Sequence, residues 1–444
     1  MSYATARRRD AQSEINKLYA EDRAVHEWYR FVLSFPPHLV HEYLTRFEIS
    51  QGQCVLDPFC GTGTVLVECK RQGIKSIGIE ANPIAHYASQ VKTNWAIDPD
   101  TLIEHATGVA QRVWARLASE GIEDSPLFDK IISLPEHLRT LTREQQDLLL
   151  KGSISPLPLH KALTLLECLE QARDERFYHH ERLAFAKALV LSSSNLRFGP
   201  EVGVGKPKPN APVVAPWLDN VHAMANDLRA QAIQAQNMTP AQAILGDARQ
   251  IGTVLEPRSV DLVITSPPYP NEKDYTRTTR LESVLLGFLH SKADLRALKK
   301  GLLRSNTRTV YKGDDDDQWV ATHPEIGRIA REIEARRIEL SKTSGFERLY
   351  STVTRLYFGG MARHLAELRG VLRPGAHLAY VVGDQASYLR VMIPTGQLLA
   401  DIAQSLGYEL VGIDLWRTRL ATATKAQLRE EVVVLHWPED QAAR

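Results

Sequence analysis

Four consecutive residues, Ser266-Pro267-Pro268-Tyr269, follow an apolar run and carry groups that could act on a ligand. Two adjacent prolines stiffen a turn and remove two backbone amide donors. Such a turn leaves its carbonyl oxygens and the Ser266 hydroxyl free to accept hydrogen bonds, and the Tyr269 ring can stack on a flat ligand. For the tetrapeptide taken alone, a plain turn is the lesser alternative. In a binding site it predicts a rigid turn that positions and polarises an amino group, without a covalent intermediate.

A second segment, residues 57–64, opens with an aspartate at the end of an apolar run and contains Gly61 and Gly63. Glycines at such a place let the backbone turn tightly and approach a ligand closely. The segment lacks the Gly-Lys-Ser/Thr continuation of a phosphate-binding P-loop. Glu80 and Asp247 end two later apolar runs. Together the three carboxylates suit a ligand that carries an amine, a ribose and an adenine.

Short apolar runs that lack alternation, each followed by a helix-like segment, predict buried parallel strands. Seven such runs with intervening helices indicate an α/β fold with a doubly wound, mostly parallel seven-stranded sheet. The chemistry-bearing segments then lie at the carboxyl ends of the strands, where open sheets bind ligands. The seven runs are residues 54–57, 76–80, 243–247, 260–265, 377–382, 409–414 and 431–436.

Two long, largely helical insertions interrupt this core, and we expect them to contact substrate or a partner. Helical packing around the sheet is the alternative for the first insertion. The acidic run Asp314 to Asp317 in the second one predicts a solvated turn rather than a metal site. The expected order is an N-terminal helical segment with the cofactor half of the core, a helical insertion, the catalytic half, a basic insertion and the C-terminal strands, at residues 1–94, 95–240, 241–270, 271–355 and 356–444.

The overall composition is ordinary and does not by itself indicate a function. The 444 residues carry 54 basic against 53 acidic side chains, so overall charge does not announce a nucleic-acid partner. The four cysteines form no metal-ligand spacing, so we expect no metal site, and so few cysteines suit a reducing compartment. The N-terminal residues show no secretory signal, and no stretch is apolar enough to span a membrane. We expect a soluble, cytoplasmic protein.

The glycine segment and the Ser-Pro-Pro-Tyr motif together resemble the S-adenosylmethionine-dependent amino-methyltransferases of DNA. In that family the Asp-Pro-Phe-x-Gly-x-Gly-Thr loop binds the methionine part of the cofactor, so the resemblance implies this role for Asp57, Phe59, Gly61 and Gly63. It also implies that Glu80 binds the ribose and that Asp247 binds the adenine amino group. Asn82 would line the adenine pocket. Phe35 and Pro36 match a further cofactor-contacting segment loosely and fit a helix cap equally well.

The resemblance also implies how the reaction proceeds. The Ser266 hydroxyl and the Pro267 carbonyl would accept hydrogen bonds from an exocyclic base amine, while Pro268 stiffens the turn and Tyr269 stacks on a base flipped out of the helix. Serine in first place occurs mostly among cytosine-N4 enzymes, although adenine-N6 remains open. Methylation of carbon 5 of cytosine needs a cysteine nucleophile, usually after a proline, and none of the cysteines follows one.

A local basic segment follows the tetrapeptide. Between Lys273 and Lys312 there are ten basic residues and three acidic ones. Phosphate contact is the functional interpretation, and a solvated helical face is the alternative. Lys206 and Lys208 lie in a Gly/Pro-rich loop and could provide a second contact. The expected nucleic-acid contacts are therefore Arg277, Arg280, Lys299, Lys300, Arg304, Arg308, Lys206 and Lys208.

These observations favour a DNA amino-methyltransferase of restriction-modification type, with cytosine N4 as the preferred target and S-adenosylmethionine as the cofactor. Adenine-N6 methylation, an RNA (tRNA) amino-methyltransferase and a non-catalytic nucleic-acid-binding module are the alternatives. A dinucleotide oxidoreductase would also use Glu80, but it would not place Asp57 beside a pyrophosphate. No nuclease motif stands out, so we expect any restriction activity on a separate polypeptide.

Overall fold

The computed structural model describes residues 18–29, 35–124, 137–199, 201–232, 239–271, 273–420 and 427–439. The N-terminal stretch in which we looked for a secretory signal lies mostly outside these residues. Of the helices described, none combines the length and the apolar character that a membrane crossing requires.

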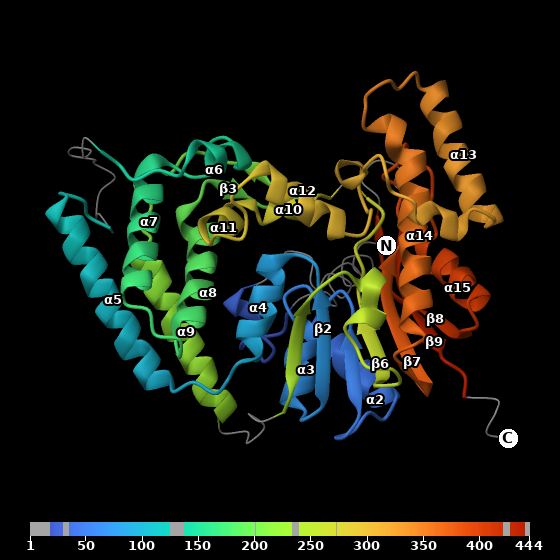
Figure 1. Ribbon diagram of the computed structural model, residues 1–444, viewed down its shortest axis with the longest axis horizontal. Helices are drawn as coiled ribbons and strands as arrows, with labels where there is room; N and C mark the ends of the chain where they lie inside the picture. Colours follow the sequence, from blue (N-terminus) through green and yellow to red (C-terminus); the bar gives the residue numbers. More distant parts are fainter. Residues whose placement is uncertain are drawn as a thin grey trace, which may run out of the picture.

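All seven predicted strands are present and form one sheet, as expected for a doubly wound methyltransferase-like fold (Figure 1). Its strand order is β5-β2-β1-β6-β7-β9-β8. The first five strands in this order run parallel, and β9 pairs antiparallel with both β7 and β8. The strands are β1 (Cys54–Asp57), β2 (Lys75–Glu80), β5 (Ala241–Leu245), β6 (Val260–Thr265), β7 (Leu372–Gly383), β8 (Glu409–Leu420) and β9 (Gln427–His436).

Helices cover both faces of this sheet and build the insertions. They are α2 (Pro37–Arg46), α3 (Thr64–Arg71), α4 (Pro83–Thr93), α5 (Pro99–Ser119), α6 (Arg143–Leu148), α7 (Pro156–Gln171), α8 (Tyr178–Ala188), α9 (Val214–Ala232), α10 (Tyr275–Thr278), α11 (Arg280–Leu285), α12 (Lys292–Gly301), α13 (Pro324–Glu339), α14 (Tyr350–Leu368) and α15 (Thr395–Ser405). Short helical turns are η1 (His26–Trp28), η2 (Leu189–Ser193), η3 (Ala248–Thr253), η4 (Thr307–Thr309), η5 (Asp316–Val320) and η6 (Glu347–Leu349).

The continuous apolar runs arise because the central strands are buried on both faces. In β1, Val55 packs with helices α2 and α3, whereas its neighbour Leu56 packs on the opposite face with α14 and α15. Val263 and Ile264 of β6 divide between the two faces in the same way. Successive side chains of a strand point to opposite faces, so each strand must be apolar throughout.

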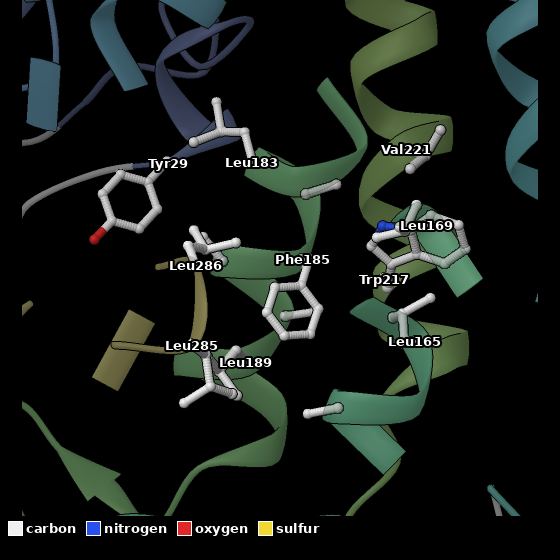
Figure 2. Packing of buried hydrophobic residues seen from close by; sticks show 14 of the residues in the cluster. Tyr29, Leu165, Leu169, Leu183, Phe185, Leu189, Trp217, Val221, Leu285 and Leu286 are labelled. Atoms are coloured by element: carbon white, nitrogen blue, oxygen red, sulfur yellow. The ribbon is translucent and has the colours of Figure 1, made fainter. Parts of the chain in front are cut away.

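The first insertion has an apolar core of its own. Helices α5, α7, α8 and α9 stand together beside the sheet, at the left in Figure 1. Phe185, Leu165 and Trp217 meet inside this bundle (Figure 2). Its cluster also contains Ile84 of α4, which joins the bundle to the sheet domain. The insertion ends in a two-stranded hairpin, β3 (Leu196–Arg197) and β4 (Gly203–Val204), followed by α9.

The second insertion packs in two directions rather than as one unit. Leu285 and Leu286, at the end of α11, join the core of the first insertion beside Phe185 (Figure 2). Ile326 and Ile329 of α13 instead pack in the cluster that includes α14. The segment that we treated as a single basic insertion therefore bridges the helical bundle and the sheet domain.

The acidic run does not form the solvated turn that we expected. Asp316 is 4% exposed and pairs with Arg249 and Arg363, at 2.5 and 3.3 Å. Asp314 accepts hydrogen bonds from Arg304 at 2.8 Å. The expectation was wrong for these two residues because their arginine partners lie far away in sequence or in a different turn.

Close packing of η5 against α14 gives a test of this arrangement. A Cβ atom on Gly359 would lie 1.9 Å from the carbonyl oxygen of Asp316, a backbone atom that cannot rotate away. We expect Gly359→Ala to lower the free energy of unfolding by about 2 kcal/mol or more, despite alanine's higher helix propensity. The matched control is Gly108→Ala in α5, where a Cβ meets no atom within 4 Å.

Gly108→Ala should instead raise the free energy of unfolding by up to about 1 kcal/mol. Urea unfolding followed by circular dichroism measures both changes. Equal effects of the two substitutions would contradict the close approach of η5 to α14.

Candidate active site

A cavity of about 710 Å³ lies where the strand order reverses, at the carboxyl ends of β1 and β6. This is the switch point at which open α/β sheets bind ligands, and the volume suits a nucleoside-sized molecule with room to spare. The glycine segment and the Ser-Pro-Pro-Tyr motif both line it. The predicted site residues on its wall are Phe35, Phe59, Gly61, Glu80, Asn82, Asp247, Ser266, Pro267, Pro268 and Tyr269.

Three further predicted residues lie behind this wall. Asp57 is 1% exposed at the end of β1, and Gly63 opens helix α3 as its N-cap. Pro36 is the N-cap of α2, next to Phe35. Phe35 therefore lines the cavity while Pro36 occupies the cap position, and the cofactor contact of this segment stays a prediction.

Asp57 connects the glycine segment directly to the strand that carries the Ser-Pro-Pro-Tyr turn. Its Oδ1 accepts hydrogen bonds from the Thr265 hydroxyl at 2.6 Å and from the Phe59 amide at 3.1 Å. Its Oδ2 is buried and has no hydrogen-bond partner among the described residues. A buried carboxylate oxygen without a donor is costly, so this atom is poised for a donor from a ligand.

Burial raises the pKa of Asp57 to about 7, against the opposing hydrogen bonds from Thr265 and Phe59. Burial also raises the pKa of Glu80 to about 7, although the backbone amides of Asn82 and Gly61 bind its carboxylate, at 2.7 and 2.9 Å. Both groups are thus easily neutralised in the free protein. A cation or strong donor in the cavity would favour their charged forms.

The glycine segment adopts the backbone conformation that its residue types permit. Gly63 has φ 84°, in the left-handed region, and a Cβ there would lie 3.0 Å from the Ser89 hydroxyl oxygen. Ser89 in turn donates a hydrogen bond to the Gly61 carbonyl at 2.8 Å. The loop is therefore held between β1 and α4 in a shape that a side chain would strain.

The Phe59–His364 contact and the side chain of Asn82 form a further part of the site. Phe59 packs edge-on against the ring of His364, with ring centroids 5.1 Å apart. His364 bonds the Tyr380 hydroxyl and the Ala248 carbonyl, and burial lowers its pKa to about 4, so the ring is neutral. Asn82 keeps its Oδ1 buried without a hydrogen-bond partner in the described part of the chain.

Asp247 is held by a partner that sequence reasoning missed. Arg249 donates from Nε to Oδ1 at 3.0 Å and from Nη2 to Oδ2 at 2.6 Å. The same guanidinium reaches Asp316 and the Lys300 carbonyl. Asp247 therefore faces the cavity with both oxygens already fixed by a bidentate arginine, and any ligand would use their remaining lone pairs.

The Ser-Pro-Pro-Tyr turn follows β6 directly. Tyr269 packs against Gly383 at the end of β7, where a Cβ would lie 3.1 Å from the ring. Burial raises the pKa of Tyr269 well above its ordinary value, so the phenol is neutral. Ser266 and the two prolines line the same cavity wall. The turn thus presents a hydroxyl, carbonyl oxygens and a ring opposite the glycine segment.

Other residues on or behind the cavity wall were not singled out from the sequence. Thr265 is buried behind the wall, directly before the motif, and its position at a strand end is the one available signal. Tyr275 of α10 and Asn306 before η4 come from the second insertion. Arg417 and Arg419 come from β8, where they pair with Glu430 of β9, at 2.5 and 3.1 Å.

Comparison with known proteins agrees with this geometry. A family model described as DNA methylase, of the N6/N4 methyltransferase type, matches residues 6–91. The type II methyltransferase M.BsoBI of Geobacillus stearothermophilus is 25% identical over 433 residues, which span 91% of this chain and 82% of the relative. M.AvaI of Anabaena variabilis is 23% identical over 402 residues, 87% of this chain and 79% of the relative. M.MjaII of Methanocaldococcus jannaschii is 40% identical over 68 residues, 15% of this chain and 13% of the relative.

Over residues 6–91 the chain matches the DNA amino-methyltransferase family model, and along most of its length it is similar to type II methyltransferases. Enzymes of this family generally take their methyl group from S-adenosylmethionine. The residues present fit such a ligand, because Asp57 and Asn82 each keep a buried oxygen free for a donor and Glu80 lines the wall between them.

The predicted DNA contacts of this methyltransferase fall into two groups. Arg280 donates to the Leu148 carbonyl of α6, Lys299 pairs with Asp274 at 2.8 Å, and Arg304 is 4% exposed between Asp314 and three backbone carbonyls. These three side chains serve internal contacts, so we remove them from the expected DNA-contacting set. The predicted contacts that remain are Lys206, Lys208, Arg277, Lys300 and Arg308.

The raised pKa values of Asp57 and Glu80 predict a pH-dependent affinity for S-adenosylmethionine, whose ammonium and ribose hydroxyls need charged acceptors. Affinity should rise from about pH 5 to about pH 7 and then level off. The folding stability of the free protein depends on pH in the opposite direction. The folded state keeps protons that the unfolded Asp57 carboxyl releases near its ordinary pKa of 3.8, so stability falls as the pH rises across the same range.

Isothermal titration calorimetry across this pH range tests the affinity. Asp57→Asn should weaken binding at neutral pH by at least about tenfold and flatten the pH dependence by about one proton. Asp219→Asn, an exposed position on α9, is the matched control. A pH-independent affinity in the wild type would contradict the assignment of these two carboxylates.

Proposed function

We propose that this DNA amino-methyltransferase binds S-adenosylmethionine through the glycine segment and transfers its methyl group to the exocyclic amine of a base flipped out of DNA, with cytosine N4 as the preferred target. The observation that carries the proposal is the convergence of the glycine segment and the Ser-Pro-Pro-Tyr turn on one cavity, joined by the Thr265–Asp57 hydrogen bond.

This arrangement supports the role that we propose for each cofactor contact. The free Oδ2 of Asp57 would accept a hydrogen bond from the ammonium group, and Glu80 would bind the ribose hydroxyls. Asp247 and Asn82 would bind the adenine, and Phe59 and Phe35 would supply apolar walls. Bound in this way, the cofactor supplies an electrophilic sulfonium methyl group.

The Ser-Pro-Pro-Tyr turn would act on the target base. A base amine is a weak nucleophile because its lone pair is delocalised into the ring. Hydrogen bonds from its hydrogens to the Ser266 oxygen and the Pro267 carbonyl would favour a tetrahedral nitrogen with its lone pair aimed at the methyl group. Tyr269 would stack on the base, and Pro268 would keep the turn rigid.

The biological setting follows from the relatives. M.BsoBI and M.AvaI carry the name type II methyltransferase. We infer a site-specific methylation that protects DNA in a restriction-modification pair, with the endonuclease on a separate polypeptide. The preference for cytosine over adenine rests on the serine at position 266.

Substitutions in the turn test its role. Ser266→Ala should lower kcat by about 100-fold, because it removes one of two acceptors that polarise the amine. Tyr269→Ala should lower kcat/KM for DNA by about tenfold to 100-fold through lost stacking, whereas Tyr269→Phe keeps the ring and most of the activity. Tritiated methyl transfer to DNA, with Ser119→Ala at an exposed position as control, measures these effects.

Affinity for S-adenosylmethionine should stay unchanged in the Ser266 variant, which separates chemistry from folding. A combined Ser266→Ala and Tyr269→Ala enzyme that still methylates DNA at the wild-type rate would show that the catalytic turn lies elsewhere.

The product identifies the target base. Mass spectrometry of nucleosides from DNA methylated by the wild type should reveal N4-methylcytosine. N6-methyladenine would instead assign the adenine alternative to the same site. Transfer to tRNA and not to DNA, measured in parallel, would overturn the proposed substrate.

A further inference from the structure

A carboxylate from the first insertion lies at the mouth of the catalytic cavity, although nothing in the reaction calls for a negative charge there. Glu201 stands between β3 and β4, near the tip of the hairpin, and lines the cavity with Ser266 and Tyr269. Its side chain is 47% exposed. The position is unfavourable for an enzyme that must bring a polyanion to this opening.

Two arginines of the second insertion face this carboxylate. Arg277 Nη1 lies 3.8 Å from Glu201 Oε2, and Arg308 Nη1 lies 3.8 Å from Oε1. Both distances are longer than a hydrogen bond, so neither pair is closed. One carboxylate therefore sits between two guanidinium groups and satisfies neither.

Each of the two arginines also has a nitrogen donor for which no acceptor is found among the described residues. Arg277 Nε and Arg308 Nη1 are buried nitrogens without a hydrogen-bond partner in the described ranges. Unsatisfied buried donors on charged groups are costly, and they indicate that a better acceptor belongs between the two side chains. A phosphate group is such an acceptor, because its oxygens can receive bonds from two guanidinium groups at once.

Both arginines follow closely on residues that line the cavity. Arg277 follows Tyr275 by two residues in α10, and Arg308 follows Asn306 by two residues at η4. Tyr275 and Asn306 both line the cavity. The ring of Phe346 lies under the Arg308 guanidinium at 5.5 Å. A phosphate held by this pair would therefore lie beside a base that has entered the cavity.

We propose that Glu201 is an internal mimic of a DNA phosphate, which occupies the Arg277–Arg308 pair in the free enzyme and is displaced by the backbone phosphate next to the flipped base. The inference rests on the proposed function, since it takes DNA as the substrate. This gives the hairpin a role in substrate selection, because only a ligand with a phosphate at this place can displace Glu201 from the two arginines.

A purely structural ion pair makes a different prediction. Exposed pairs contribute up to about 1 kcal/mol, so a structural role for Glu201 would appear as a small loss of stability and nothing more. A phosphate mimic competes with DNA, and its removal must tighten DNA binding. The direction of the change in DNA affinity therefore separates the two roles.

The experiment measures binding of a fluorescein-labelled DNA duplex of mixed sequence by anisotropy, at about 50 mM and about 200 mM salt. Glu201→Gln should tighten binding about two- to fivefold at the lower salt concentration, with a steeper salt dependence. KM for DNA should fall by a similar factor, while affinity for S-adenosylmethionine stays constant. Glu201→Ala provides a second variant, and Glu104→Gln, an exposed position on α5, is the matched control.

A double-mutant cycle makes the test specific to the arginine pair. In a background with Arg277→Met and Arg308→Met, DNA binding should be weaker than in the wild type, and Glu201→Gln should no longer tighten it. Melting temperatures confirm that each variant is folded.

Unchanged or weaker binding by Glu201→Gln would overturn the inference, as would a gain that persists without the arginines. Both results leave methyl transfer by the wild type intact. A wild type that transfers no methyl group to DNA would instead overturn the proposed function, and this inference with it.

Discussion

The hydrogen bond from the Thr265 hydroxyl to Asp57 joins the two halves of the active site. Each residue ends one of two adjacent parallel strands, β6 and β1, so the sheet itself brings them together. Because the bond is buried, its length and direction are fixed by strands that cannot slide without exposing both apolar faces. The glycine segment and the Ser-Pro-Pro-Tyr turn start from these two residues, and their relative position follows from this contact.

Charged groups of both signs surround the cavity. Asp57 and Glu80 lie buried at the ends of β1 and β2, where burial raises their pKa values, and Arg417 and Arg419 line the β8 side of the wall together with Glu430. A sulfonium cofactor is cationic and DNA is anionic, so each is attracted to groups of a different sign. Loss of the methyl group leaves a neutral sulfur, which weakens the attraction of the two buried carboxylates for the spent cofactor.

The seven strands could be predicted because each one is buried on both faces and is apolar without interruption. Once the strands were predicted, their carboxyl ends also predicted where the candidate site lies. The contact of Arg249 with Asp316 could not be predicted, since no local pattern announces a pair 67 residues apart. The same limit explains the acidic run: in isolation four aspartates suit water, and only tertiary structure supplies the arginine partners of Asp314 and Asp316. Whether a basic residue faces DNA or an internal carboxylate, as Arg304 does, also depends on such partners.

The Arg249 network has a mechanical consequence for how DNA and cofactor are brought together. Its guanidinium binds Asp247 on the cavity wall, Asp316 in η5 and the Lys300 carbonyl in α12. η5 in turn rests on α14, whose Gly359 and Gly360 leave no room for a side chain at this contact. The second insertion is therefore fastened to the cofactor pocket at one end and to the helical bundle through Leu285 and Leu286 at the other. Tyr275 and Asn306, which this insertion contributes to the cavity wall, are therefore positioned by anchors on both sides.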